Sequence, residues 1–419
     1  MPLYDPGRHE ALRKVRWDAA EARRAIERIA ADAEERFSPT GYWPTHPNDS
    51  DGPGPDFPLY MGACGVMWAL HYLEGLGAVG LRRSYLPFVE PLVPLIDDWL
   101  GKDRDLHRPS YLMGETSVLM LSHALEPAAA KVARIRDLIE ANIEHPAREM
   151  LWGAPGTMLA AVLMHEQDGD ARWAQAFRRN AKHLEGKLLW SPEHECHYWT
   201  QDMYGQTSSY LDGVHGFVAT ASVLTRGRHL LEAGEWERWQ ERIGNTIRRT
   251  ATRDGPLANW RAWLYPAWKA GRPMLVQHCH GASGFVTCLG DFPDASLDDL
   301  LVAGGELTWL AGPLAKGANL CHGTAGNGYA FLKLHRRTGD PKWLERARAF
   351  AMHALAQSRA DEKQFSRMRY SLWTGDPGLA IYLWDCIHEG ARFPTLDAFF
   401  PSPTPAGTPP APRSPRRGR

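Results

Sequence analysis

The chain has 419 residues, of which 44% are hydrophobic, and a formal net charge of −1. This length and apolar content suffice for one large core or for two or three domains. The near-neutral charge gives no reason to expect nucleic acid or an acidic membrane surface as a partner.

The first predicted element is a charged N-terminal helix. Apolar side chains recur on one face from Leu12 to Ile29, and this spacing predicts a surface helix over about 8–37. The segment lacks the apolar stretch of a signal peptide. No run of about eighteen apolar residues follows that could form an integral membrane segment. The expected location is therefore cytoplasmic.

One theme then recurs seven times, a short Gly-rich turn followed by an apolar helix of about a dozen residues. The first small residues of the seven turns are Gly62, Gly114, Gly153, Gly216, Gly281, Gly323 and Gly375. The mean step of about 52 residues leaves room for two helices in each unit. The segments between the turns, such as 172–189 and 341–358, have charged faces and predict amphipathic outer helices.

Alternating buried and amphipathic helices predict an all-α protein. The expected fold is an α/α toroid, a double ring of helices with little β-structure. Glycine at the turns permits positive φ and close approach of the backbone where the inner helices converge. We expect a single toroid domain over 1–400. The Pro-rich, basic segment 401–419 has no apolar period and is predicted to be a disordered tail.

Six cysteines in a chain of this length do not indicate a disulfide framework. Three lie in apolar helical patterns and are predicted to be small buried hydrophobes: Cys64, Cys288 and Cys386. A fourth, Cys196, is flanked by His194 and His197 in a polar segment, a pattern more typical of a solvated loop than of a metal site. The sequence does not decide whether this triplet binds anything.

The last two cysteines are each followed by His and Gly, in "CHGASG" from Cys279 and "CHGTAG" from Cys321. They fall in the fifth and sixth turns, and His215 has the equivalent place in the fourth. A ring would bring these turns to one mouth. Two cysteines and a histidine are a ligand set that catalytic zinc uses with a fourth position open. The alternative is a pair of buried thiols beside a hydrogen-bonded histidine, but two matched patches favour the metal.

These turns resemble those of the lanthionine synthetase C-like family, and the resemblance extends over nearly the whole chain up to the tail. It implies an α/α toroid with one Zn²⁺ bound by Cys279, Cys321 and His322. It also implies a catalytic histidine at His215, and it places Glu149 where some members carry an acidic residue. The implied reaction is attack of a cysteine thiol on dehydroalanine or dehydrobutyrine, which gives a thioether.

Two departures bear on the branch of the family. Ring-forming cyclases usually carry Tyr after the first zinc cysteine and Arg four residues before it, whereas this chain has His280 and Leu275. The turn sequences resemble the stand-alone branch, similar to eukaryotic proteins that couple glutathione to dehydroamino acids in damaged proteins. Three cations are candidate contacts for a glutathione or peptide carboxylate: Lys316, which matches a lysine of that branch, Arg367 and Arg369.

The resemblance thus implies a dehydroamino-acid-containing peptide or protein as partner, with glutathione as a candidate co-substrate and a lanthipeptide ring-forming cyclase as the alternative. His278 replaces a Trp common before the first zinc cysteine, which bears on the substrate contacts at the mouth.

Two other classes of function stay open. A glycoside hydrolase would need two carboxylates, and Glu149, Asp212 and Asp376 lie at turns. A non-catalytic adaptor would bind peptides at the mouth of the toroid and use zinc only as a structural ion. The electrophile, the thiol and the oligomeric state are not determined by the sequence.

Overall fold

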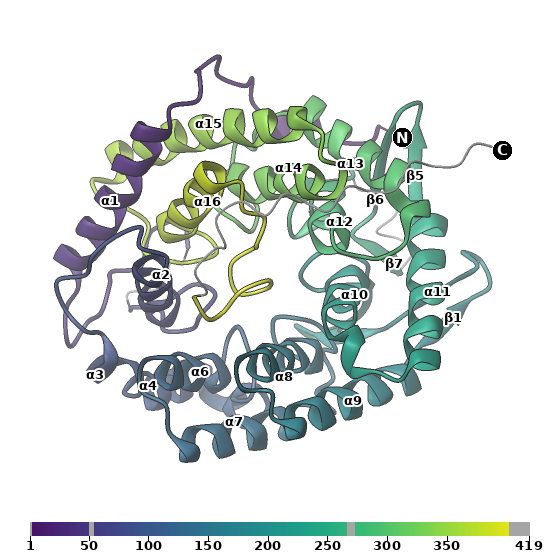
Figure 1. Ribbon diagram of the computed structural model, residues 1–419, viewed down its shortest axis with the longest axis horizontal. Helices are drawn as coiled ribbons and strands as arrows, with labels where there is room; N and C mark the ends of the chain where they lie inside the picture. The colour runs from purple at the N-terminus through teal and green to yellow at the C-terminus, as the bar shows by residue number, and fades with distance from the viewer. Residues whose placement is uncertain (1, 50–53, 266–272, 402–419) are drawn as a thin grey trace.

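The computed structural model describes residues 2–49, 54–265 and 273–401. Its helices form two concentric rings, which confirms the predicted α/α toroid (Figure 1). Over the described residues the inner ring consists of α2 (Ala63–Gly75), α6 (Glu115–Leu125), α8 (Ala154–Asp168), α10 (Phe217–Arg226), α12 (Ala282–Leu289), α14 (Thr324–Thr338) and α16 (Asp376–His388). None of the described helices is both long enough and apolar enough to cross a bilayer.

The outer ring alternates with the inner ring along the chain. Its members are α1 (Ala19–Arg36), α3 (Leu86–Val89) with α4 (Leu92–Leu100), α7 (Ala129–Ala141), α9 (Ala171–Gly186), α11 (Ala233–Thr250), α13 (Asp298–Ala311) and α15 (Pro341–Phe365). Short helical turns lie between them: η1 (Pro6–Arg8), η2 (Gly101–Asp103), α5 (Arg104–His107), η3 (Gly227–Leu230) and η5 (Ala295–Leu297). The ring closes where α16 packs against both α1 and α2.

Each inner helix begins directly after one of the seven predicted turn glycines, which is its N-cap. Only Gly281 among the seven has positive φ, at 98°, so the predicted need for positive φ is wrong at the other six. Their common requirement is close approach of the backbone. A Cβ on Gly216 would lie 2.0 Å from the amide nitrogen of Asp212, and one on Gly281 would lie 1.9 Å from the carbonyl oxygen of Leu275. Each turn therefore folds tightly onto the loop that precedes it.

The N-terminal helix begins later than the sequence predicts. Helix α1 starts at Ala19, because the carboxylate of Asp18 accepts hydrogen bonds from the amides of Ala20 and Glu21 and so caps it. The residues before it form an arm along α13 and α15, where Glu10 contacts the buried ring of His353 with an O–N distance of 2.6 Å. The segment predicted as a helix over 8–37 is thus helical only from Ala19 onward.

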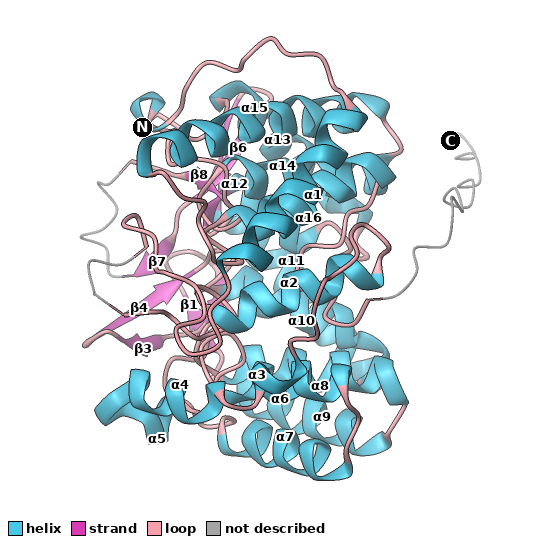
Figure 2. Ribbon diagram, turned by 90° about the vertical axis from the view of Figure 1, so that its left-hand side faces the viewer, coloured by secondary structure: helices cyan, strands magenta, loops and turns pink. Residues whose placement is uncertain are grey.

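Strands are few and short, as predicted, and several gather on one face of the toroid (Figure 2). The antiparallel pairs are β1 (Leu189–Ser191) with β2 (Cys196–Tyr198), β5 (Ala251–Asp254) with β6 (Leu257–Trp260), and β8 (Val276–Gln277) with β9 (His280–Gly281). A three-stranded sheet has the order β3 (Gln201–Met203), β4 (Gln206–Tyr210), β7 (Trp263–Tyr265). In β4 and β7, Ser209 pairs with Tyr265 and Tyr210 with Trp263, so the register shifts by a bulge.

The chain after α16 turns back into the middle of the ring (Figure 1). We call residues 393–399 the axial plug. Phe393, Thr395 and Phe399 in it are almost fully buried. Tyr111 donates a hydrogen bond to the carbonyl of Thr395 at 2.7 Å, and the indole of Trp68 donates one to the carbonyl of Phe399 at 2.9 Å. The inner helices therefore enclose a segment of their own chain, which completes the core.

We expect the predicted tail to be dispensable for the fold, although it lies outside the described residues from 402 onward. Its composition cannot bury enough apolar surface to offset its ordering entropy. Deleting residues 402–419 should leave the melting temperature and metal content unchanged. By contrast, Phe399→Ala should lower the free energy of unfolding by about 3–5 kcal/mol, since the ring is buried in the core. Thermal denaturation of both variants tests this, and a tail deletion as damaging as Phe399→Ala would contradict it.

Candidate metal centre

A pocket of about 410 Å³ opens among the turns that begin the inner helices. Its lining comes from turns one, two, three, four, five and six, together with the β3–β4 hairpin and the loop before α14. Six of the residues singled out in the sequence line it: His215, Cys279, His280, Lys316, Cys321 and His322. The toroid thus brings together turns that are far apart in the chain.

The ligand atoms of Cys279, Cys321 and His322 all lie within 4.8 Å of one another. The two cysteines are buried and the histidine is half-buried. Turns five and six are joined directly, because the amide of Cys279 donates to the carbonyl of Cys321 at 3.0 Å. The amide of His322 donates to the side chain of Asn319 at 2.9 Å. Backbone contacts therefore hold the three ligands in place.

Both sulfur atoms accept hydrogen bonds from side chains. The phenol of Tyr60 donates to the Sγ of Cys321 and the amide of Gln277 donates to the Sγ of Cys279, each at 2.9 Å. The hydrogen bond from Cys279 holds the pKa of Cys321 well below its usual range, and the same bond, together with burial, raises that of Cys279. The hydrogen bond between the two thiols therefore favours a single thiolate shared by the pair. Donors aimed at two sulfurs and one nearby imidazole fit Zn²⁺, which prefers soft, hydrogen-bonded ligands of this kind.

Beside the cluster, His215 forms a pair with Glu149. The Nδ1 of the histidine lies 2.8 Å from the Oε2 of the fully buried carboxylate. The amides of Leu151 and Trp152 also donate to this carboxylate, at 2.9 and 2.6 Å. Burial alone would lower the pKa of His215, but the hydrogen bond and charge of Glu149, with the charges of Asp212 and Cys321, raise it to about 9. With Nδ1 engaged by Glu149, Nε2 is the nitrogen left for other contacts.

A second histidine–carboxylate pair was missed by sequence reasoning: His280, which lines the same pocket, is paired with the buried Asp212. The Nδ1 of His280 lies 2.6 Å from the Oδ2 of Asp212, whose other oxygen accepts from the amides of Val214 and His215. Asp212 is fully buried, and the ring of Tyr210 stacks on His280 with centroids 6.4 Å apart. The carboxylate of Asp212 therefore holds His215 by that residue's backbone amide and His280 by its imidazole ring.

Other candidates from the sequence lie elsewhere. Arg369 is buried and forms a two-pronged ion pair with Asp49, with its Nε 2.8 Å from Oδ2, and neither it nor Arg367 lines the pocket. The carboxylate of Asp376 accepts hydrogen bonds from the hydroxyl of Ser358 and from the backbone amide of Arg369. The remaining candidate is the histidine-flanked Cys196 on the β1–β2 hairpin. Among the described residues, its ligand atoms do not converge with those of His194 and His197 as the three of the pocket do.

His278, which replaces a Trp common in the family, does not line the pocket. Its ring is fully buried and stacks on Phe393 of the axial plug, with centroids 4.2 Å apart. Burial lowers its pKa to about 4, so the ring is neutral. His278 precedes Cys279 in the turn between β8 and β9, and it therefore links this turn to the plug.

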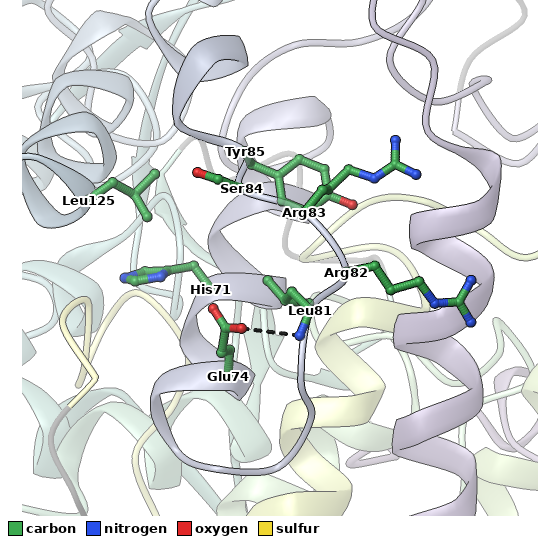
Figure 3. A pocket seen from close by; sticks show the side chains of 8 residues that line it. All are labelled: His71, Glu74, Leu81, Arg82, Arg83, Ser84, Tyr85 and Leu125. Carbon is green, nitrogen blue, oxygen red and sulfur yellow. Dashed lines mark hydrogen bonds between the residues drawn. The ribbon is translucent and has the colours of Figure 1, made fainter.

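A different pocket, of about 380 Å³, lies at the end of α2 (Figure 3). The guanidinium groups of Arg82 and Arg83 point away from the space between His71 and Glu74. The Glu74 carboxylate accepts a hydrogen bond from the amide of Leu81 at 3.1 Å. The residues that line this space include neither a thiol nor a histidine–carboxylate pair. The cysteine pocket is therefore the better candidate site.

Comparisons with known proteins give a family and a fold. The family model described as lanthionine synthetase C-like protein matches residues 55–398. The chain is 36% identical over 132 residues to glutathione S-transferase LANCL1 of Danio rerio (30% of this chain, 32% of that protein). It is 37% identical over 135 residues to LanC-like protein GCL1 of Arabidopsis thaliana (29% and 30%). The chain spans about a third of the length of these curated relatives. The solved structure of nisin cyclase superposes with a TM-score of 0.54 at 13% identity, covering 88% of this chain and 99% of that one, and shows the fold.

Proposed function

The chain belongs to the lanthionine synthetase C-like family, and from this premise we propose that it is a zinc-dependent enzyme that forms thioethers. It would add a cysteine or glutathione thiol to dehydroalanine or dehydrobutyrine residues of a peptide or protein. The observation that carries this proposal is the cluster of Cys279, Cys321 and His322 in one pocket with the His215–Glu149 pair.

The three clustered residues would hold one zinc ion. When bound, zinc lowers the pKa of a coordinated thiol, which is about 8.5 for a free cysteine and leaves only a few per cent thiolate at neutral pH. Tyr60 and Gln277, which already donate to the two sulfurs, would stabilise the negative charge of the ligands. These contacts also fix where the two sulfur ligands lie relative to His215.

His215 would move the proton of the reaction. The thiol sulfur forms a bond to Cβ of the dehydroamino acid, and the electrons of the carbon–carbon double bond move toward Cα and its carbonyl. A proton from His215 Nε2 then reaches Cα, and the proton lost by the thiol restores the histidine, so the net change is addition of the thiol across the double bond. A pKa of about 9 keeps His215 protonated at neutral pH, as an acid in this step requires. Glu149 orients the ring through Nδ1.

Glutathione is the thiol that the residues favour. Leu275 and His280 depart from the ring-forming pattern, and Lys316 lines the pocket as an exposed cation that can meet a carboxylate. Arg369 adds no support, since Asp49 already neutralises it. The six cysteines are all free, which supports the proposal of a reducing, cytoplasmic setting.

The burial of the carboxylates next to the pocket weakens the sugar-hydrolase alternative. Glu149 and Asp212 are both fully buried and each is engaged by a histidine and by backbone amides. Neither of them lines the pocket, nor does Asp376, the third carboxylate considered. A hydrolase of this fold would need two carboxyl groups facing the sugar.

The proposed reaction is tested by mass spectrometry of a dehydroalanine-containing peptide incubated with the zinc-loaded protein. We expect a glutathione adduct to form faster than in the protein-free control, and faster than any internal thioether when the peptide also carries a cysteine. Efficient stereoselective ring closure without glutathione would indicate the cyclase branch instead. Absence of acceleration with either thiol would favour the peptide-binding adaptor.

A further inference from the structure

The cysteine pocket has two chemically different sides. Cys321, His322 and Lys316 come from the loop and turn before α14 and form a side rich in ligands and charge. Apolar and aromatic residues from turns one to three and the β3–β4 hairpin form the other side, which we call the apolar wall: Met61, Met113, Leu151, Trp152 and Tyr204. The first four are buried or half-buried. The two sets of residues differ in chemistry and therefore suit different partners within one pocket.

We propose that the apolar wall binds the dehydroamino-acid peptide, through the dehydro residue and an apolar residue next to it, while the thiol co-substrate lies on the Lys316 side. This inference rests on the proposed function. The electrophile would be an extended peptide with apolar residues next to the dehydro residue. The methionine and leucine side chains of the wall can adapt to varied apolar groups of such a peptide. The pocket volume of about 410 Å³ holds a small ligand and one or two residues but not a longer segment.

The position of His215 decides which side takes the electrophile. The proton has to reach Cα of the dehydro residue, so that carbon must lie within reach of His215. The His215 ring meets the Tyr204 ring edge-on, with centroids 6.5 Å apart. Its partner Glu149 accepts from the amide of Trp152 in the wall. The proton donor thus contacts the apolar wall, whereas Lys316 lies in the loop before the turn of the sulfur ligand Cys321.

Tyr204 of the apolar wall has an unfavourable backbone conformation. It occupies the tip of the β3–β4 hairpin with φ of 53°, a left-handed conformation that a bulky residue rarely adopts, and Gly205 follows with φ of 72°. Its hydroxyl accepts a hydrogen bond from the indole of Trp152 at 2.8 Å. The side chain is 65% exposed, so its outer face is open to a ligand at the pocket rim. This arrangement holds an aromatic ring over the entrance beside His215.

The test varies both substrates of the zinc-loaded protein. We compare the dehydroalanine peptides Ac-Leu-Dha-Leu-NH2 and Ac-Gly-Dha-Gly-NH2 with glutathione as the thiol. We expect kcat/KM to be about tenfold higher for the leucine peptide, because each buried apolar contact contributes this order of discrimination. Tyr204→Ala should raise KM for the leucine peptide about tenfold and leave KM for glutathione unchanged. Tyr204→Phe should retain most of the preference, since the ring contact persists.

The matched control is Trp190→Ala. Trp190 is an exposed aromatic residue, 51% accessible, on the neighbouring β1–β2 hairpin, and it does not line the pocket. Its replacement should change neither KM. An equal loss in this control, equal kcat/KM for the two peptides, or a rise of KM for glutathione in place of that for the peptide would each overturn the assignment of the wall.

A binding experiment separates this inference from the proposed function. Fluorescence anisotropy measures the affinity of a labelled Leu-Ala-Leu peptide, in which alanine replaces the dehydro residue, without any turnover. Tyr204→Ala should weaken this binding about tenfold while Trp190→Ala does not. If turnover is absent with every thiol but this pattern holds, the proposed chemistry fails and the wall stands as a peptide site. Equal binding by all variants overturns the wall.

Discussion

Cys321→Ala is expected to lose both the metal and the thioether-forming activity. The side chain supplies one of three clustered ligand atoms, and its sulfur accepts a hydrogen bond from the Tyr60 hydroxyl. Two remaining ligands do not make a structural or catalytic zinc site of the kind that proteins use. Elemental analysis of the purified variant should show zinc falling from about one ion per chain to near zero, and the peptide assay should show only the background reaction.

Cys196→Ala is the matched control for the loss of a buried thiol. Cys196 is as buried as Cys321, but it lies on the β1–β2 hairpin outside the cluster. This variant should retain zinc and activity even if its melting temperature falls. Stoichiometric zinc in a protein with both Cys279→Ala and Cys321→Ala would rule out the proposed ligand set, whatever the activity.

His215→Ala is expected to slow thioether formation by about 10²–10⁴-fold while the protein keeps its zinc. That range is typical for the loss of one positioned proton-transfer group. His215 is not part of the ligand cluster, so metal content should not change. Single-turnover rates with the dehydroalanine peptide, measured on samples of equal zinc content, test the role. A variant that reacts at the wild-type rate would show that the proton comes from another group.

The pH dependence of the rate provides a second readout for His215. Its folded-state pKa of about 9 lies above the ordinary value, so the protonated form is present below about pH 9 and is lost as the pH rises through that value. The groups that face it with negative charge are Glu149, Asp212 and Cys321. Glu149→Gln removes the nearest of these charges, so the alkaline limb of the pH–rate profile should shift to lower pH. An unchanged limb in this variant would show that another group sets it.

The sequence predicts the inner ring well because its signal is local and repeated. Each turn glycine is followed at once by an apolar helix, and each helix begins at the glycine in the structure. The meeting of Cys279 and Cys321 follows from the same repetition, since equivalent turns of a ring share one face. Features fixed by a single long-range contact leave no such trace in the sequence.

Several such contacts shape the candidate site. Nothing in the sequence distinguishes Tyr60 from other aromatic residues that precede a turn glycine. Its hydroxyl nevertheless donates a hydrogen bond to the sulfur of Cys321, far along the chain. Asp212 sits in the fourth turn, but its partner His280 is in the fifth. The sequence likewise suggests that Arg369 is available to bind a carboxylate of a substrate. Its ion pair with Asp49, which lies far away in the chain, cannot be predicted from the residues around it. Pairings of this kind depend on how the turns face one another, which repeat spacing alone does not determine.

The axial plug and the contact of α1 with α16 have a consequence for biosynthesis. Helix α1 leaves the ribosome long before α16 exists, so its partner is missing while the intervening helices emerge. The apolar inner helices remain without their centre until Phe393, Thr395 and Phe399 are translated. Trp373, whose carbonyl accepts a hydrogen bond from the amide of Cys321, is also translated after Cys279 and Cys321. Nascent chains should therefore stay open and depend on chaperones until release, and a prematurely terminated chain should be cleared by proteolysis as an unfolded product that retains no zinc.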